Sequence, residues 1–132
     1  GQGTRTEVDN PVILDWLAAQ AGRAEYVCSV CTGSALLARA GLLDGVRATT
    51  NKMAFAWVAA QREQVKWEKE ARWVEDGRFF TSSGVSAGMD MSLAMIARIL
   101  DQQTAEQFAC WAEYEWHQDA GWDPFARIHG LV

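Results

Sequence analysis

Two cysteines stand three residues apart in the stretch EYVCSVCTGSALLARAG, which spans residues 25–41. A Cys-x-x-Cys pair suggests dithiol or zinc chemistry, but Cys28 falls inside a predicted strand, where residues three apart face opposite sides of a sheet. The sequence has no second Cys-x-x-Cys and only two histidines, so further metal ligands are missing. We therefore interpret Cys28 as a strand packing residue and expect neither a metal ion nor a cofactor.

Cys31 differs, because it lies where the predicted strand stops and Thr32-Gly33-Ser34 begins a helix. The exposed amides and the dipole of a helix N-terminus lower the pKa of a thiol there. A sharp strand-to-helix turn also projects its side chain above the carboxyl edge of a sheet, as nucleophile elbows do, and Gly33 permits a close backbone approach. Cys31 is therefore a candidate nucleophile, and the residues alone leave a packed small side chain as the alternative.

The elements that must position Cys31 follow from capping residues, glycines and apolar spacing. Asn10-Pro11 is typical of a helix start, Gly41 of a helix end, and Asp76-Gly77 of a tight hairpin turn. The predicted helices span 11–22, 33–40, 51–61, 87–100 and 104–114, and the predicted strands span 25–30, 47–49, 72–75 and 78–82.

Alternating strands and helices indicate one domain with a three-layer α/β fold and a mainly parallel sheet. The parallel strands led by 25–30 and 79–82 are too few for a sheet that is buried on both faces. A buried strand needs flanking partners for its backbone groups. We therefore expect the missing strands to come from upstream residues or from another polypeptide.

The composition excludes several classes of partner. The chain has 132 residues and a net charge of −5, and its basic residues are scattered, so a nucleic-acid surface is not expected. No apolar run is long enough to cross a bilayer, and the N-terminus has no signal-peptide pattern, which favours a cytoplasmic protein without a membrane partner. Three cysteines, an odd number, favour reduced thiols.

Other residues are candidates for lining a site. Ser83, Gly84 and Val85 should lie at the same sheet edge as Cys31, since ligands collect at the carboxyl ends of parallel strands. The hydroxyl of Thr32 could equally contact substrate or cap the helix. Four side chains receive mainly structural interpretations. Asp90 is interpreted as a helix-dipole or loop-bracing carboxylate, with contact to the chemistry as the alternative. His117 and His129 are interpreted as surface residues, with a place beside the pocket as the alternative for His117, and Cys110 as a buried small hydrophobe. Four tryptophans are expected in the core: Trp16, Trp57, Trp73 and Trp111.

Three segments together resemble the ThiJ/PfpI superfamily, particularly its isocyanide-hydratase-like branch: SVCTGSALLARAGLLDGVRATTN, DGRFFTSSGVSAGMDMSLAMIARIL and EYEWHQDAGWDPFA. The resemblance covers most of the chain. It implies a flavodoxin-like, usually homodimeric sandwich with a reactive cysteine at the position of Cys31. It also implies that residues 1–132 form the C-terminal portion of one domain. An N-terminal segment would then supply the first strands and a carboxylate that hydrogen-bonds the cysteine.

The resemblance also indicates roles for further residues. The backbone N–H of Thr32 and amides of the loop from Gly1 to Gly3 are expected to act as stabilising donors near substrate. Asn51 stands where related sequences carry a histidine, and an amide cannot be a general base. This difference disfavours a Cys-His peptidase and suits a thiolate that attacks an electrophilic carbon while a carboxylate handles protons.

Three functional hypotheses follow. The first is a cysteine-dependent hydratase or hydrolase acting on a small electrophile, with isocyanide hydration as the nearest named reaction. The second is a non-enzymatic small-molecule or redox sensor, in which Cys31 is oxidised reversibly. The third is the ligand-binding domain of a transcription regulator.

Overall fold

The computed structural model describes all residues from Gly1 to Val132, and its centre is a three-stranded sheet with the order β1-β5-β4. Strand β1 (Val27–Val30) runs parallel to β5 (Phe79–Ser82), with Val30 beside Ser82. Strand β4 (Trp73–Asp76) is antiparallel to β5, and the two form the predicted hairpin around Gly77, whose φ of 59° suits glycine. Strand β1 is therefore an edge strand with one open side.

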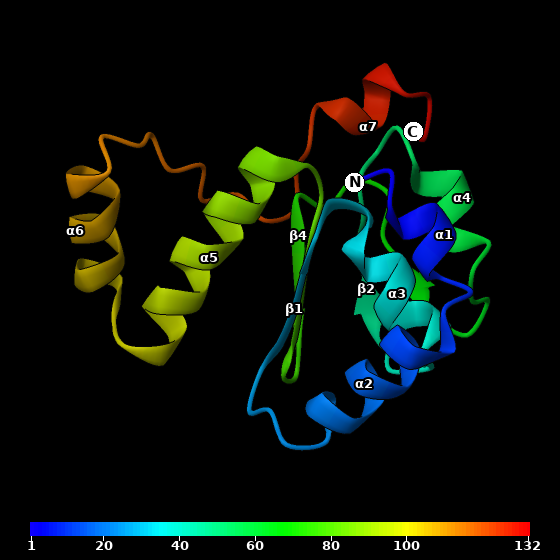
Figure 1. The fold of residues 1–132 in the computed structure, drawn as a ribbon. Helices are drawn as coiled ribbons and strands as arrows, with labels where there is room; N and C mark the ends of the chain where they lie inside the picture. The colour runs from blue at the N-terminus through cyan, green and yellow to red at the C-terminus, as the bar shows by residue number, and fades with distance from the viewer.

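Helices cover both faces of this sheet, which gives the predicted three-layer α/β arrangement (Figure 1). Helix α5 (Val85–Ile99) lies on one face, and α2 (Pro11–Ala21) and α3 (Ser34–Arg39) lie on the other. The remaining elements are α1 (Thr4–Glu7), η1 (Cys31–Gly33), β2 (Arg47–Ala48), α4 (Phe55–Ala59), β3 (Lys66–Trp67), α6 (Gln102–Trp111) and α7 (Phe125–Ile128).

Local signals in the sequence explain where several helices begin and end. Asn10 caps α2 by accepting a hydrogen bond from the Val12 N–H, and Pro11 follows at the first helical position, as expected. Gly41, with φ of 77°, follows the end of α3. The last long helix begins earlier than predicted, because Asp101 rather than Thr104 is its cap.

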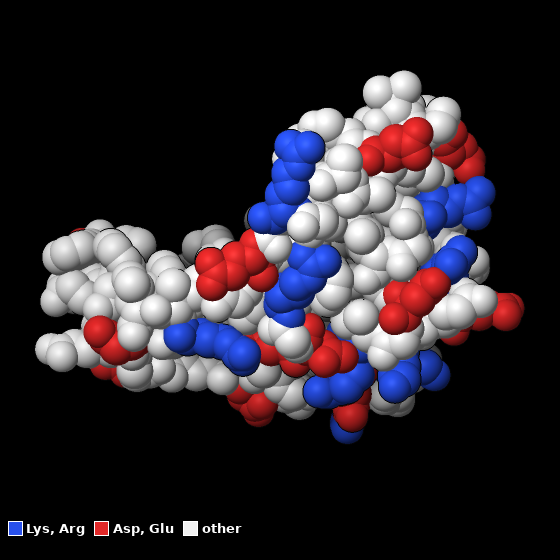
Figure 2. Space-filling view, turned by 90° about the horizontal axis from the view of Figure 1, so that it is seen from below, with Lys and Arg blue, Asp and Glu red and all other residues white.

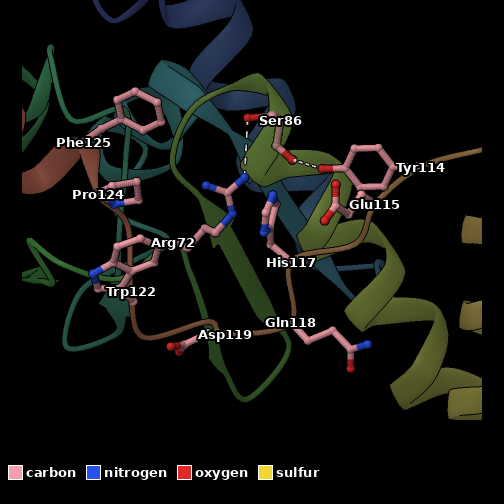
Figure 3. Close-up of a pocket in the computed structure, with 10 residues that line it drawn as sticks. All are labelled: Arg72, Ser86, Tyr114, Glu115, His117, Gln118, Asp119, Trp122, Pro124 and Phe125. Carbon is pink, nitrogen blue, oxygen red and sulfur yellow. Dashed lines mark hydrogen bonds between the residues drawn. The ribbon is translucent and has the colours of Figure 1, made fainter.

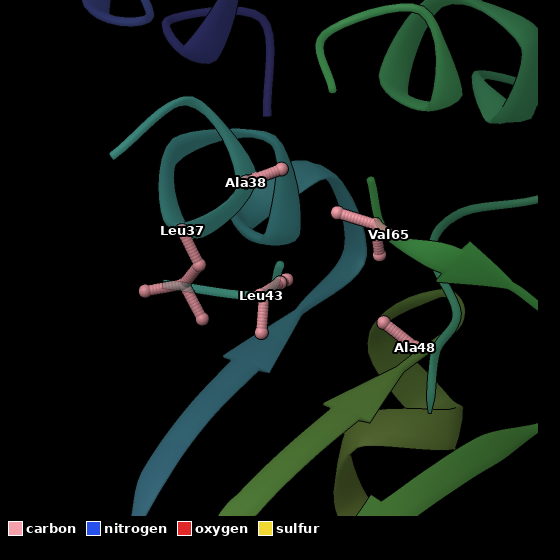
Figure 4. Close-up of a cluster of buried hydrophobic side chains, with 5 residues drawn as sticks. All are labelled: Leu37, Ala38, Leu43, Ala48 and Val65. Atoms are coloured by element: carbon pink, nitrogen blue, oxygen red, sulfur yellow. The ribbon is translucent and has the colours of Figure 1, made fainter. Parts of the chain in front are cut away.

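The largest apolar cluster lies between α3 and the small parallel sheet formed by β2 and β3 (Figure 4). Its buried members are Leu37, Ala38, Leu43, Ala48 and Val65. On the other face of the main sheet, Trp73 and Phe80 pack with Met91 of α5. These two clusters hold the helical layers against the sheet, and they confirm a core position for Trp73.

Some local predictions were wrong. Thr4–Glu7 forms a short helix that was not predicted, and Lys66–Trp67 forms an unpredicted strand that pairs with β2. The helix predicted for residues 51–61 is confined to Phe55–Ala59. A two-residue strand carries too little apolar alternation to be recognised from sequence.

Several apolar side chains predicted to be buried are exposed. Trp16 is 60% exposed and Trp111 is 70% exposed, and Cys110 is also exposed. Helix α6 stands at the outer end of α5, away from the body of the molecule (Figure 1). Because α6 packs mainly on α5, its remaining sides, which carry Trp111 and Cys110, have no covering layer.

Basic and acidic side chains are interspersed over the face shown in Figure 2, and neither sign forms a continuous patch there. Two of the five ion pairs, Arg39–Asp9 and Arg62–Asp44, join partners that are both more than a third exposed. No helix combines the length and the apolar character needed to cross a membrane.

Candidate functional site

The backbone at Cys31 is held in the left-handed region, with φ of 58°. Non-glycine residues seldom adopt this conformation, and a residue so held at a strand-to-helix junction is typical of a nucleophile elbow. The Cys31 N–H donates to the Ser83 carbonyl at 2.8 Å, and the Cys31 carbonyl accepts from the Thr50 hydroxyl at 2.9 Å. These bonds fix the turn on both sides, so the sharp elbow predicted at Cys31 is present.

Helix α5 approaches this elbow closely because one of its residues is glycine. A Cβ on Gly88 would lie 2.6 Å from Cγ1 of Val30, the residue before Cys31. Only a hydrogen side chain leaves room for this contact. The first turn of α5 is thereby seated beside the end of β1.

The Gly1–Gly3 loop also reaches the elbow. The Thr32 hydroxyl lies 2.8 Å from the Gly1 nitrogen and 3.1 Å from the Thr4 hydroxyl, and it donates to the Gly1 carbonyl at 3.1 Å. Thr32 is buried, and its side chain caps no helix. Of the two roles considered for this hydroxyl, capping is therefore wrong; the hydroxyl anchors the N-terminal loop. A Cβ added at Gly33 would lie 3.6 Å from the Ser29 Cβ, which is an ordinary van der Waals contact.

Four of the predicted lining residues meet at one cavity of about 450 Å³. They are Asn51, Ser83, Gly84 and Val85. Cys31 lies beside this cavity through its bond to Ser83 but is not one of the residues that line it. These four residues therefore lie together at one sheet edge, as expected. Cys31 itself does not line the cavity, but its hydrogen-bond partner Ser83 does.

Other lining residues were not foreseen. Met53 and Met89 contribute apolar walls, and Phe125 and His129 reach the cavity from α7 and the residue after it. His129 is exposed, as predicted, yet it faces this opening. A sequence signal near this placement is Asp123, whose carboxylate accepts from the Phe125 N–H at 3.1 Å in the turn that precedes α7.

Asp90 braces the tail that leads to α7. This fully buried carboxylate pairs with the Arg72 guanidinium at 2.7 Å and accepts from the Tyr114 hydroxyl at 2.9 Å and from the His117 N–H at 3.0 Å. The loop-bracing role predicted for Asp90 is confirmed. Arg72 and Tyr114 line a second cavity of about 580 Å³, together with His117 and the aromatic residues Trp122 and Phe125 (Figure 3).

Lys52 is a buried cation in the wall of the first cavity. Its ammonium donates to the Thr49 hydroxyl at 2.7 Å and to the Ala71 carbonyl at 2.5 Å. Burial lowers the pKa of Lys52 to about 8, and the charges of Asp123 and Glu68 oppose that shift. Thr49 follows β2 and Ala71 precedes β4, so the hydrogen bonds of the Lys52 ammonium connect these two strands. Lys52 therefore has a structural role.

Cys28 and Cys31 do not converge. The Cys28 thiol lies on the β1 face that meets α5, with its sulfur 3.2 Å from the Met95 sulfur, and burial raises its pKa. Cys28 is nevertheless an exposed residue, because β1 is an edge strand. A dithiol site formed by these two cysteines is therefore not present.

The fold and the elbow define a class of protein: a flavodoxin-like α/β sandwich with a cysteine at the strand-to-helix turn. Residues 1–98 match the DJ-1/PfpI family, so the chain belongs to that family. It is 36% identical over 114 residues to an isonitrile hydratase from Pseudomonas putida, covering 86% of this chain and 49% of that protein.

Two further relatives show the range of the family. A ThiJ/PfpI family protein from Pseudomonas syringae superposes with a TM-score of 0.77 at 36% identity, over 87% of this chain and 46% of that one. The HTH-type transcriptional regulator GbdR of Pseudomonas aeruginosa is 40% identical over 85 residues, which are 64% of this chain and 23% of the regulator. The chain thus spans about half the length of the isonitrile hydratase and less of the regulator.

Proposed function

We propose that Cys31 is the nucleophile of a hydratase or hydrolase-like enzyme that acts on a small electrophilic substrate, with isonitrile hydration as the nearest reaction. The observation that carries this proposal is the left-handed backbone at Cys31, beside the first turn of α5. A strained non-glycine conformation costs on the order of 1–3 kcal/mol, and such residues cluster at active sites. The similarity to an isonitrile hydratase supports the choice of reaction.

The proposed reaction consumes one water and changes no oxidation state of the protein. The Cys31 sulfur forms a bond to the terminal carbon of the isonitrile while an acid delivers a proton to that carbon, giving a thioimidate. Water then adds to the same carbon and the nitrogen gains a proton. The carbon–sulfur bond breaks as the former water loses its second proton, which yields a formamide and returns the thiolate.

These steps need a group that moves protons, and no carboxylate is hydrogen-bonded to Cys31 in this chain. Asn51 cannot serve, and its amide oxygen already accepts from the Ala54 N–H at 3.0 Å. We propose that an N-terminal segment of the same protein pairs with the open edge of β1 and supplies the carboxylate. The exposed aromatic pair Phe108 and Trp111 on α6 supports a homodimer, because such surface is costly to leave in water.

The direct test measures formamide production from cyclohexyl isonitrile by the full-length protein. Cys31→Ser should lower kcat by about a thousandfold or more, since serine at this position is a far weaker nucleophile. Cys110→Ser is the matched control, because Cys110 is an exposed thiol on α6, and this variant should retain activity. Wild-type turnover in Cys31→Ser would contradict the catalytic assignment.

A ligand-sensing role is the second candidate, favoured by the 40% identity to an HTH-type transcriptional regulator. In that case the cavity binds a small molecule without turnover, and the Cys31→Ser variant binds it unchanged. A redox sensor would instead form a sulfenic acid at Cys31 with peroxide, releasing water. Because Cys28 and Cys110 are exposed, thiol labelling must use a Cys28→Ser/Cys110→Ser background to report on Cys31 alone.

A further inference from the structure

The cavity that contains Ser83 adjoins the cavity of Figure 3 at the start of α5. Ser86, in the first turn of α5, and Phe125, the first residue of α7, line both of them. Figure 3 shows both residues in the upper part of the view, Phe125 at the left and Ser86 near the centre. The cavities of about 580 and 450 Å³ are therefore neighbours at the N-terminus of the helix, and we refer to the two together as the cleft.

The first turn of α5 has free hydrogen-bond donors in this cleft. Gly84 is the N-cap and offers no side chain, and the first backbone bond of the helix runs from the Gly88 N–H to the Gly84 carbonyl. The N–H groups of Val85, Ser86 and Ala87 consequently donate to no protein atom. A helix of 15 residues adds partial positive charge at this end, which favours an anion.

A buried hydroxyl provides a second, independent sign of a ligand. Ser83 is only 2% exposed and lines the smaller cavity, yet its hydroxyl has no hydrogen-bond partner in the protein. Ser29 Oγ is the one side-chain polar atom that is both fully enclosed and without a hydrogen-bond partner. The Ser83 hydroxyl also has no partner, so it is not fully enclosed, and the space into which it opens is the cavity. Buried hydroxyls are rarely left unpaired, which indicates that something in the cavity pairs with Ser83.

Asn51 adds a donor from the opposite wall. The Ala54 N–H occupies its amide oxygen, which orients the amide nitrogen toward α5. That nitrogen lies 3.9 Å from the position a Cβ would take on Gly84, and it donates to no protein acceptor. The backbone amides, the Ser83 hydroxyl and the Asn51 amide thus present donors to one space.

Charge distinguishes the two ends of the cleft. The smaller cavity is lined by no aspartate or glutamate and has Lys52 and His129 in its wall, whereas Glu115 and Asp119 line the larger one. Lys52 uses its ammonium protons on protein acceptors, so it contributes positive potential and no bond to a ligand. An anionic group is therefore favoured at the end that contains Ser83.

We propose that this end of the cleft binds the carboxylate of a small organic molecule, through the amides of Ser86 and Ala87, the hydroxyl of Ser83 and the side-chain amide of Asn51. The apolar part of the ligand would contact the remaining walls, which are Met53, Met89 and Phe125. That this carboxylate belongs to the substrate rests on the proposed function, whereas the binding itself does not require the Cys31 thiol.

The test titrates ¹⁵N-labelled protein with sodium propionate at constant ionic strength and follows the backbone amide signals of residues 83–87. Saturable shifts confined to this turn are expected with propionate and not with chloride. Ser83→Ala should weaken binding by about tenfold, because it removes one hydrogen bond to a charged group. Ser86→Asp should abolish binding, since its own carboxylate then competes for the free amides while the helix start is stabilised.

Ser92→Asp is the matched control, because it adds the same charge to the exposed face of the same helix and should leave binding intact. Equal shifts with chloride, or binding that survives Ser86→Asp, would overturn the proposal. Tighter binding of inorganic phosphate than of propionate would overturn its carboxylate part. Cys31→Ser is expected to retain propionate binding. Turnover in that variant therefore tests the proposed function, and propionate binding tests the carboxylate site separately.

Discussion

The backbone N–H of Cys31 donates to the carbonyl of Ser83 across 2.8 Å, and this bond joins the elbow to the residue that leads into α5. The Ser83 N–H in turn donates to the Arg72 carbonyl at 2.9 Å, and the Arg72 side chain is paired with Asp90. The elbow, the first turn of α5 and the tail that carries α7 are therefore parts of one hydrogen-bonded unit. Changes at residues remote from the thiol should alter this unit in measurable ways.

Gly88→Ala should destabilise the protein through the contact between α5 and β1. The added methyl would lie 2.6 Å from Val30 Cγ1, and overpacking of this kind costs about 1–3 kcal/mol. Alanine by itself favours a helix by about 1 kcal/mol over glycine, so the clash must outweigh that gain. Urea unfolding should show a lower free energy of unfolding for Gly88→Ala than for the wild type.

A Val30→Ala background supplies the control for this prediction. Removing the two γ-carbons of Val30 removes the nearest contacts, and only its Cβ at 3.3 Å remains close. In that background Gly88→Ala should become neutral or stabilising, because only the helix propensity is left. The same destabilisation in both backgrounds would mean that the Val30 contact is not its cause.

Asp90→Asn should loosen the tail and reduce stability. The carboxylate is fully buried with Arg72, and breaking a buried pair on one side costs about 3–5 kcal/mol. Asp9→Asn is the control, since Asp9 forms an exposed pair with Arg39 that is worth at most about 1 kcal/mol. Limited proteolysis should cut the segment after Tyr114 faster in Asp90→Asn and at the wild-type rate in Asp9→Asn.

A spectroscopic readout separates loss of this contact from general unfolding. Burial raises the pKa of Tyr114, and its hydrogen bond to Asp90 and the charge of that carboxylate raise it further. In folded Asp90→Asn the Tyr114 pKa should therefore fall toward its ordinary value. A titration of tyrosinate absorbance, with Tyr26→Phe to isolate the signal, measures the change; an unaltered pKa would contradict the assigned bond.

Lys52 should make stability rise with pH in the alkaline range. Burial lowers its pKa in the folded protein to about 8, from an ordinary value of 10.5. Between these values the unfolded chain binds a proton that the folded chain has released, so the free energy of unfolding increases with pH. The full difference corresponds to about 3 kcal/mol, and below pH 8 this gain is absent.

The difference between wild type and Lys52→Met isolates this effect from the titration of cysteines and tyrosines. Urea unfolding is measured at pH 7.5 and at pH 10, which together span most of the range from about 8 to 10.5. Between these two pH values the free energy of unfolding should rise less, or fall more, in Lys52→Met than in the wild type. Lys69→Met is the matched control, because Lys69 is exposed and should follow the wild type. Parallel curves for all three proteins would show that Lys52 is not desolvated in the folded state.

The elements that were predicted correctly are those whose signals are local. Asn10-Pro11 and Asp76-Gly77 determine a helix start and a hairpin through their own backbone preferences, and both appear as expected. The strand Lys66–Trp67 was missed because it is defined only by pairing with β2. Trp111 looked like a core residue because its apolar spacing does not reveal whether another layer covers that face.

The candidate site shows the same difference between residues that local signals place and residues that only the three-dimensional fold places. Cys31, Ser83 and Gly84 could be placed together because parallel strands end at a common edge. Phe125 and His129 reach that edge only through the fold of the tail, about 40 residues beyond the sheet, and their sequence spacing to Ser83 carries no such information. Lys52 was missed for a related reason, since a lysine rarely becomes buried and only the three-dimensional arrangement of its acceptors shows it.

The open edge of β1 leads to the last prediction. In a parallel pair the residues that bond to the neighbour alternate, and the N–H groups of Val27 and Cys31 point toward β5. The N–H groups of Cys28 and Val30 therefore point to the open side. Hydrogen exchange of the 132-residue chain should find these two amides unprotected while Val27 and Cys31 are protected. In the full-length protein Cys28 and Val30 should become protected if an N-terminal strand pairs with β1, and continued rapid exchange there would refute that pairing.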